Sequence, residues 1–478
     1  MISSASPQND RPTGSTGTGG LTRRSLIGFG AASAAGVLLT AGARPLAGNP
    51  AQRMWDTIVI GAGASGLGAA RVLADAGKKV LVLEARDRIG GRLWTDTTSM
   101  GIPFERGAEL VHGTTVSTWG LIDQLGLQTH KWENEYSKWS PGNPSWVSQG
   151  DFEFYHFPQG APSFPNGLPD PADGETAEAW LLRIGVPRDN YPLSLLVIEV
   201  DTEQFDVLPA THIIGDVEEA LELQSESGPI PPEEYGDYRV IGGYNQVLQP
   251  LAAGIPLRLN SRVHTVEYRK NHVSIHVGSQ RFKARTTVIA LPGGVLKHGD
   301  ITFSPPLPAE RRDAIQEIEY LPVFKGILEF AAPVLAADPT VPPAWDLLET
   351  YSQNPPTLWN ASVGTPGYTG QLIVTWMTGG KAQELLDLPE HERHLAGLET
   401  VRAAAGDPGL EFVNASTYDW SKDEFARGAY PGPFSRRSGL NGPIENVLFW
   451  AGMTTSTVHS SRNSGVAAAG QVLEALAK

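Results

Sequence analysis

The residues with the most evident chemistry form a glycine turn between two short apolar runs. Gly61, Gly63 and Gly66 follow a β-branched run, and the second run ends on Glu84. In a strand–turn–helix unit, the first glycine makes the tight turn, the second lets the backbone approach a pyrophosphate, and the third allows close helix–strand packing. Free N–H groups at the helix N-terminus bind phosphate, and the acid accepts hydrogen bonds from ribose hydroxyls. The pattern predicts a dinucleotide site.

Nicotinamide and flavin dinucleotides share that turn, so residues beyond Glu84 must distinguish them. Gly90-Gly91-Arg92 follows the acid, and residues 106–113 read Arg-Gly-Ala-Glu-Leu-Val-His-Gly. Four further motifs lie at residues 285–292, 322–328, 449–455 and 464–470. Together these segments resemble the flavin-containing amine oxidases, a family that includes monoamine, polyamine and L-amino-acid oxidases. The histidine in the 106–113 motif is most similar to the polyamine oxidase branch.

This resemblance implies bound FAD and oxidation of a C–N bond in a small polyamine or monoamine. The cofactor takes a hydride equivalent, water hydrolyses the imine, and dioxygen is reduced to hydrogen peroxide. An L-amino-acid or cyclic-amine oxidase remains an alternative, as does a flavin dehydrogenase or desaturase. A nicotinamide-dependent dehydrogenase and a non-catalytic flavoprotein are alternatives outside that activity. We expect noncovalent FAD, because the chain has no Cys and Ala429 stands where monoamine oxidases attach flavin.

The resemblance also assigns the reacting end of the site. Lys325 is similar to the family lysine that reaches the flavin through a water, and Tyr430 to one tyrosine of the aromatic cage. His112 is expected to contact substrate or a water on the access path, although a structural hydrogen-bonding role fits a lone His equally. Arg462 replaces the second cage tyrosine and could bind a carboxylate, which keeps amino-acid-like substrates open. No metal site is predicted.

The remaining predicted contacts are with the cofactor. Met453 replaces the usual polar residue after Ala-Gly, so its backbone amide is expected to serve instead. Val263 is expected on the adenine side by resemblance alone. The predicted cofactor-binding residues are Gly61, Gly63, Ala64, Ser65, Gly66, Glu84, Ala85, Arg86, Gly91, Arg92, Gly107, Ala108, Glu109, Leu110, Val263, Trp420, Gly452, Met453, Gly465 and Val466. Three further acids, Glu203, Asp206 and Glu218, could select a polyamine or be solvated loop charges.

These motifs must be positioned by an α/β fold with two discontinuous domains. Apolar and polar residues alternate from 256 to 291, which indicates strands and a β-meander. We expect a Rossmann-type FAD-binding domain with this meander, plus an inserted α+β substrate domain with helices at 381–386 and 392–405. The predicted FAD-binding parts are 54–140, 236–300 and 412–478, and the substrate parts are 141–235 and 301–411.

The first 43 residues read as an export signal. Arg23-Arg24 precedes a modest apolar run, and Ala41-Gly42-Ala43 has the form of a signal-peptidase site. The segment resembles a twin-arginine signal, which predicts the twin-arginine machinery as a partner and a periplasmic or extracellular location. The net charge of −15 argues against nucleic acid as a partner. Beyond the N-terminus, the sequence shows no stretch apolar enough to span a membrane.

Overall fold

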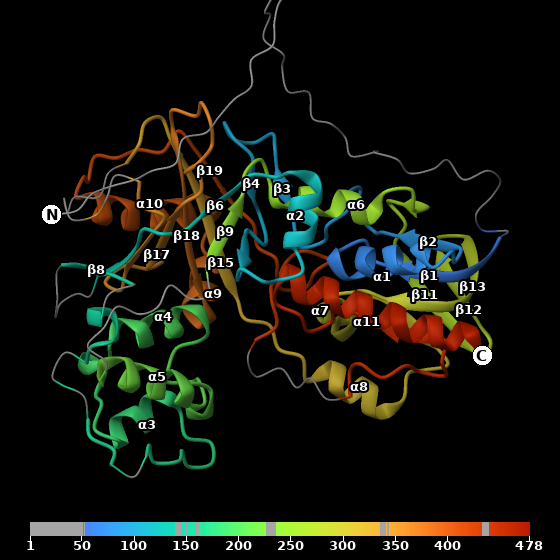
Figure 1. The fold of residues 1–478 in the computed structure, drawn as a ribbon, viewed down its shortest axis with the longest axis horizontal. Coiled ribbons are helices and arrows are strands. Elements are labelled where there is room, and N and C mark those ends of the chain that lie inside the picture. Colours follow the sequence, from blue (N-terminus) through green and yellow to red (C-terminus); the bar gives the residue numbers. More distant parts are fainter. Residues whose placement is uncertain are drawn as a thin grey trace, which may run out of the picture. The chain divides into compact units, whose positions relative to one another are not determined.

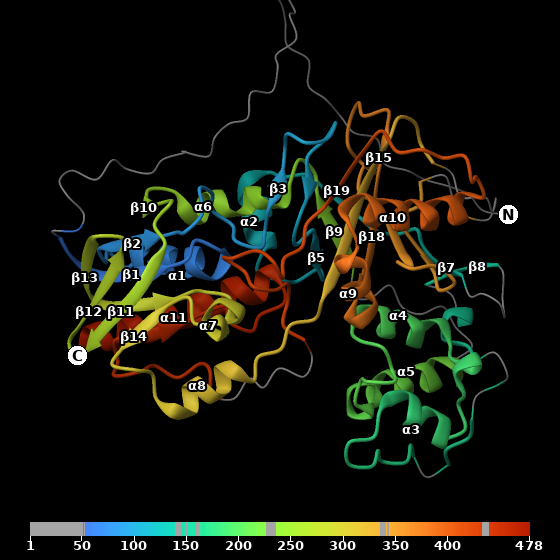
Figure 2. The ribbon, with the colours of Figure 1, turned by 180° about the vertical axis from the view of Figure 1, so that it is seen from behind.

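The computed structural model describes most of the chain after residue 50. The described residues are 51, 53–138, 145–149, 152–157, 160, 162–165, 167–225, 236–334, 341, 344–432 and 439–478. The predicted export signal therefore lies outside the described residues. Figures 1 and 2 show two groups of strands, one around β1 and one around β15, each covered by helices.

The first group, the β1 sheet, contains the glycine turn. β1 (Met54–Ile60) lies between β2 (Val80–Leu83) and β13 (Gln280–Ile289), parallel to both. Parallel strands covered by helices on both faces are continuously apolar, which explains the β-branched sequence. α1 (Ala64–Asp75) and α11 (Val458–Ala477) lie side by side against this sheet (Figure 1). The Rossmann-type arrangement predicted from the sequence is confirmed.

The predicted meander is confirmed for three antiparallel strands, but it starts later than expected. β11 (Val263–Arg269) pairs with β12 (His272–Val277), which pairs with β13. β10 (Leu257–Arg258) instead extends the opposite edge by pairing in parallel with β2. Asn260 adopts a positive φ of 51° between them and turns the chain past β2 toward the meander.

The second group, the β15 sheet, has the order β19-β15-β18-β17-β16-β7-β8. Its strands are β7 (Glu135–Lys138), β8 (Trp146–Ser148), β15 (Val323–Phe330), β16 (Leu347–Thr350), β17 (Thr357–Asn360), β18 (Gln371–Thr378) and β19 (Asn414–Thr417). The helices α9 (Gly379–Asp387) and α10 (Glu390–Ala405) pack on it, at the positions predicted from sequence. A helical segment with its own core adds α3 (Ala177–Arg183), α4 (Leu193–Asp201) and α5 (Ile214–Ser225).

The remaining elements are short. They are β3 (Thr95–Asp96), β4 (Phe104–Glu105), β5 (Leu110–His112), α2 (Trp119–Leu125), β6 (Thr129–Lys131), β9 (Asp237–Val240), α6 (Gln249–Ala252), α7 (Gly293–His298), β14 (Thr302–Ser304), α8 (Ala309–Gln316) and β20 (Leu448–Trp450). β9 pairs with both β5 and β6. This small sheet brings residues 106–113 toward the β15 sheet.

Strand pairing departs from the predicted domain boundaries in three places. β7 precedes residue 141 but pairs with β16 of the β15 sheet. β19 follows residue 411 but also belongs to that sheet, through β15. β14 follows residue 300 yet pairs with β11 of the β1 sheet. Short strands near a crossover carry little sequence signal for which sheet they join, so composition misplaces these boundaries.

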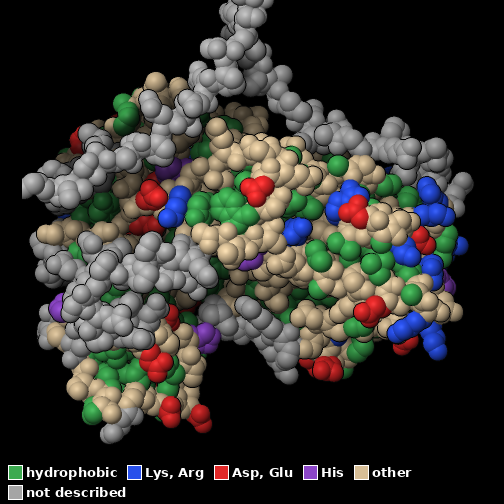
Figure 3. All heavy atoms as spheres, in the orientation of Figure 1, with side chains coloured by type: hydrophobic (Ala, Val, Ile, Leu, Met, Phe, Trp, Pro, Cys, Tyr) green, Lys and Arg blue, Asp and Glu red, His purple; other side chains and the backbone are tan. Residues whose placement is uncertain are grey.

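Charged side chains of both signs are spread over the face shown in Figure 3, with Lys and Arg more frequent toward the β1 sheet. Within the described ranges, the helices are too short or too polar to cross a membrane.

Candidate active site

A cavity of about 610 Å³ extends between the two sheets. At one end it is lined by the glycine turn and Glu84, and at the other by Lys325, Trp359 and Trp376. This volume is typical of a small-molecule or cofactor site. Most of the predicted site residues line it, which brings together motifs more than 300 positions apart in the sequence.

The glycine turn has the geometry that a pyrophosphate requires. Gly61 has φ of +103°, and a Cβ there would lie 2.4 Å from the carbonyl oxygen of Ala290. A Cβ on Gly66 would lie 2.0 Å from the carbonyl oxygen of Gly61. Gly63 instead is the N-cap of α1 and lines the cavity, and the nearest atom to a Cβ there would be 3.8 Å away. Two glycines thus make the turn compact, while Gly63 leaves room for a ligand at the helix N-terminus.

Glu84 is fixed at the end of β2 by the backbone. Its carboxylate accepts hydrogen bonds from the N–H groups of Ala62, at 2.7 Å, and Arg86, at 2.9 Å. The amide of Ser261 donates to the Glu84 carbonyl at 2.7 Å, which brings the loop before Val263 to the same place. Burial raises the pKa of Glu84, although these backbone hydrogen bonds oppose the shift. The free lone pairs of the carboxylate can accept ribose hydroxyls, so this end of the cavity fits the FAD that the sequence predicts.

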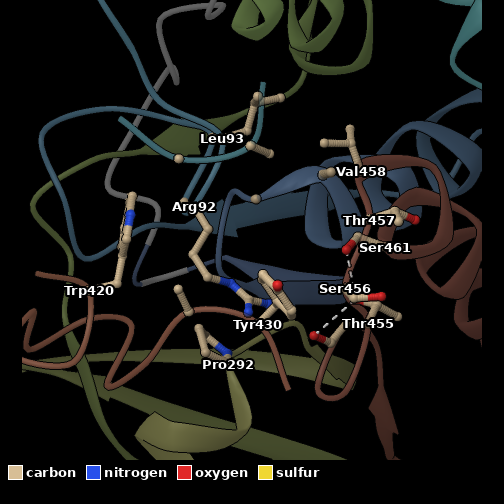
Figure 4. Close-up of a pocket in the computed structure, with 18 of the residues that line it drawn as sticks. Arg92, Leu93, Pro292, Trp420, Tyr430, Thr455, Ser456, Thr457, Val458 and Ser461 are labelled. Carbon is tan, nitrogen blue, oxygen red and sulfur yellow. Dashed lines mark hydrogen bonds between the residues drawn. The ribbon is translucent and has the colours of Figure 1, made fainter. Parts of the chain in front are cut away.

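Aromatic and basic residues follow along the cavity. The indole of Trp420 donates to the carbonyl of Arg106 at 2.9 Å, which fixes the ring in the wall. Figure 4 shows Arg92 extending into the cavity, with Trp420 on one side and Tyr430 on the other in that view. The guanidinium of Arg86 forms a buried ion pair with Asp423, at 2.5 Å, so its side chain already has a partner.

Lys325 lies on β15 and has two acceptors from the 106–113 motif. Its Nζ donates to Glu109 Oε2 at 2.8 Å and to the carbonyl of Gly107 at 3.0 Å. The ammonium also lies 5.3 Å from the centre of the Trp359 ring. Lys325 is therefore buried and paired at the cavity wall, as expected for a site residue rather than a solvated surface lysine.

Five predicted residues do not line the cavity. The Met453 side chain packs in the core, in the cluster that contains Ile318. Gly465 is required for helix packing, because a Cβ there would lie 1.9 Å from the carbonyl oxygen of Ser65. Val466 is 37% exposed on α11. Gly66 supports the turn, as described above.

Arg462 is the fifth of these residues. It lies against α1, where its backbone oxygen would be 2.9 Å from a Cβ on Gly68, and it is not part of the cavity wall. The α11 helix turns this position toward α1 instead of the cavity, which the linear motif does not reveal. The amino-acid alternative depended on Arg462 and loses that support.

The start of α11 supplies polar contacts that the sequence analysis missed. Thr455, Ser456, Thr457 and Ser461 line the cavity (Figure 4). The hydroxyls of Thr455 and Ser461 lie 2.6 Å apart, and Thr457 caps the helix. The hydroxyl-rich run before α11 was a visible signal, and it provides polar groups where Met453 does not.

The cavity acids also differ from those expected. Glu203 accepts from the amide of Gly380 at the start of α9, while Asp206 and Glu218 are solvent-exposed. Other carboxyl groups line the cavity instead, and we call four of them the acidic cluster: Glu135, Asp201, Asp237 and Glu349. They come from β7, α4, β9 and β16, so sequence spacing offered no signal for them.

Glu349 is the buried centre of the acidic cluster, with 2% exposure. Its carboxylate accepts from Ser137, Gln149 and Tyr351 at 2.9–3.0 Å. These three donors are uncharged side chains. Burial raises the pKa of Glu349. A carboxylate that is desolvated without a cation favours either a proton or a cationic ligand.

The other members of the cluster repel one another. Burial, followed by the charges of Asp237 and Glu349, raises the pKa of Glu135 to about 7. Burial and the charges of Glu349 and Asp237 raise the pKa of Asp201 to about 8, although its side chain is open to the cavity. The hydroxyl of Tyr430 donates to the Asp201 carbonyl at 3.4 Å. The geometry thus gathers carboxyl groups, which a cationic ligand would help to ionise, near the predicted cage tyrosine.

His112 also belongs to this part of the cavity. Burial lowers the pKa of His112, but the hydrogen bond and the negative charge of Asp237 together raise it by more. The net shift of the pKa is therefore upward. In the part of the chain that the structure describes, no group of His, Asp or Glu is arranged to hold a metal ion.

Comparison with known proteins agrees with this geometry. The family model described as flavin containing amine oxidoreductase matches residues 64–185 and 231–473. Polyamine oxidase 3 of Oryza sativa subsp. japonica is 28% identical over 453 residues, covering 87% of this chain and 88% of that protein. Polyamine oxidase 2 of Arabidopsis thaliana is 28% identical over 449 residues, with 87% of each chain covered.

Solved structures share the fold. A putrescine oxidase bound to putrescine superposes with a TM-score of 0.68 at 22% identity, covering 88% of this chain and 99% of the other. Cyclohexylamine oxidase from Brevibacterium oxydans IH-35A gives a TM-score of 0.69 at 21% identity, covering 89% and 100%. At this identity the likeness establishes the architecture and leaves the substrate to be argued from the cavity.

Proposed function

Because this chain belongs to the flavin containing amine oxidoreductase family, we propose that it oxidises a C–N bond of a diamine or polyamine. FAD-dependent amine oxidation, the general activity predicted from the sequence, is confirmed by the family. The proposal concerns the substrate class. It is supported by the acidic cluster and by the similarity to polyamine oxidases.

Residues at the first end of the cavity would hold FAD. Glu84 would accept the ribose hydroxyls, and the backbone around Gly63 and the start of α1 would bind the pyrophosphate. Bound FAD supplies the hydride-accepting chemistry, and dioxygen regenerates it with release of hydrogen peroxide. The chain's own residues must bind and orient the amine and restrict water.

The acidic cluster is the observation that carries the proposal. A diamine has a nitrogen that reacts and a second nitrogen that stays protonated. The reacting amine must be neutral to have a free lone pair, and Trp359 and Trp376 provide an apolar wall beside Lys325 that disfavours the charged form. Glu349 and its neighbours favour the protonated, charged form of the second nitrogen. One cavity therefore offers an apolar wall for the reacting amine and a cluster of carboxyl groups for an ammonium.

A peroxide-coupled screen tests this substrate class. The panel should contain monoamines, diamines, polyamines, cyclic amines and L-amino acids, each assayed for kcat/KM. We expect the highest kcat/KM for a diamine or polyamine. Higher values for a monoamine, a cyclic amine or an amino acid would overturn the proposal while leaving FAD-dependent amine oxidation intact.

We further propose that the protein is exported by the twin-arginine machinery to the periplasm or beyond. The support is Arg23-Arg24, the apolar run after it and Ala41-Gly42-Ala43. This route carries folded proteins, which suits an enzyme that binds its cofactor before export. Changing both arginines to Lys should leave full-length, FAD-loaded protein in the cytoplasm, and undiminished export would refute the assignment.

A further inference from the structure

Lys325 and Glu109 form an ion pair, with 2.8 Å between Nζ and Oε2. The two side chains are 9% and 4% exposed, and both line the cavity. Glu109 lies just before β5 of the small sheet, while Lys325 lies on β15 of the β15 sheet. The pair therefore joins the 106–113 motif to the lysine strand at the wall of the cavity.

The neighbouring carboxyl group provides a contrast. Glu105, four residues earlier, is also buried, but it accepts from the hydroxyl of Thr95 and the amide of Tyr244. It does not line the cavity. Glu109 is thus the carboxylate that contacts the ammonium, and Glu105 is available as a matched control.

We propose that Glu109 is a positioning residue for amine oxidation, which fixes the Lys325 ammonium at the cavity wall and neutralises its charge there. The inference rests on the FAD-dependent activity and is independent of which amine is the substrate. An unpaired buried cation near the cofactor stabilises added negative charge, whereas a salt-bridged one contributes much less. Glu109 would therefore set both the position of Lys325 and the local electrostatic potential.

A redox titration of the FAD-loaded protein measures the charge directly and requires no amine. Glu109→Gln keeps the side-chain size and removes the negative charge, so the flavin midpoint potential should rise. Lys325→Met should lower it, and the double variant should lie between the two single variants. Flavin occupancy, measured by absorbance, verifies that each variant is folded and loaded.

The titration is best done at pH 6 with Glu105→Gln as the control. Burial raises the pKa of Glu105 to about 7, so at pH 6 this carboxyl is mostly neutral and its replacement removes little charge. The control should leave the midpoint potential near that of the wild type. If the midpoint potential shifts equally in Glu109→Gln and Glu105→Gln, or shifts in neither, Glu109 does not neutralise the charge of Lys325 and the proposal is overturned.

Anaerobic stopped-flow measurement of flavin reduction by a saturating amine tests the positioning role. Glu109→Gln should slow reduction several-fold in the wild-type background, because the ammonium is no longer held. In a Lys325→Met background the same change should have little further effect, since no ammonium remains to be positioned. Independent, multiplicative losses would show that Glu109 acts separately from Lys325 and would refute the proposal.

Discussion

The Nδ1 atom of His112 lies 2.7 Å from Oδ1 of Asp237, and both side chains line the cavity that contains Lys325. His112 was predicted from its motif, whereas Asp237 was not. The pairing of β5 with β9 places the two residues opposite each other. Because Nδ1 is occupied, an interaction of this ring with an amine or a water would use Nε2.

The first prediction concerns this pair. Asp237→Asn keeps the side-chain shape but removes the negative charge that raises the pKa of His112. The pKa of His112, followed by NMR titration, should therefore fall in the variant. His394 lies on α10, where burial lowers its pKa, and its titration should be the same in the variant and the wild type. An unaltered His112 titration would show that Asp237 does not control its charge.

The second prediction links the acidic cluster to stability. Glu135 has a folded-state pKa of about 7, above its ordinary value of 4.5. Its contribution to folding stability is therefore present below pH 4.5 and is lost as pH rises through 7. Glu135→Gln removes this dependence, so in the absence of amine its Tm relative to the wild type should be higher at pH 8 than at pH 5.

Thermal unfolding at the two pH values checks this, with Glu474→Gln as a control on the exposed side of α11. The control should change Tm equally at both pH values. If Glu135→Gln behaves like the control, burial does not disfavour the ionised form of Glu135.

The glycine turn was predictable because its chemistry depends on contiguous residues. Gly61, Gly63 and Glu84 lie within one strand–turn–helix–strand unit, so their spacing determines their geometry. Lys325 and Tyr430 were predicted by resemblance, and both line the cavity. Their catalytic roles stay predictions.

The acidic cluster was not predictable in this way. Glu135 and Glu349 become neighbours only through the parallel pairing of β7 with β16, across 214 sequence positions. Arg462 is the opposite case. It has the sequence spacing from Gly465 that predicts a cavity residue, but it packs against α1 instead of lining the cavity. Tertiary contacts, rather than local pattern, decide both cases.

The third prediction tests the cofactor end. Gly63→Val places a branched side chain in the cavity where the pyrophosphate must approach, so FAD occupancy of the purified protein should fall sharply. Gly215→Val is the control, because a Cβ at that helical glycine meets nothing within 4 Å and the residue lies outside the cavity. Normal occupancy in a folded Gly63→Val protein would contradict the assigned site.

The fourth prediction is that FAD is held noncovalently. The chain has no Cys, and the cavity-lining Ala429 offers no group for attachment. Acid precipitation should release all the yellow chromophore into the supernatant, as measured by absorbance. Flavin that remains with the precipitated chain would indicate attachment through another side chain.

The central claim is that the acidic cluster binds the second ammonium of a diamine. Anaerobic stopped-flow reduction should be compared for 1,4-diaminobutane and 1-aminobutane, which differ only in that second amine. We expect the wild type to bind the diamine at least roughly tenfold more tightly, a difference of about 1.4 kcal/mol, and Glu349→Gln to lose most of this advantage. Equal apparent Kd values for the two amines in the wild type, or a diamine advantage that Glu349→Gln leaves intact, would contradict the claim.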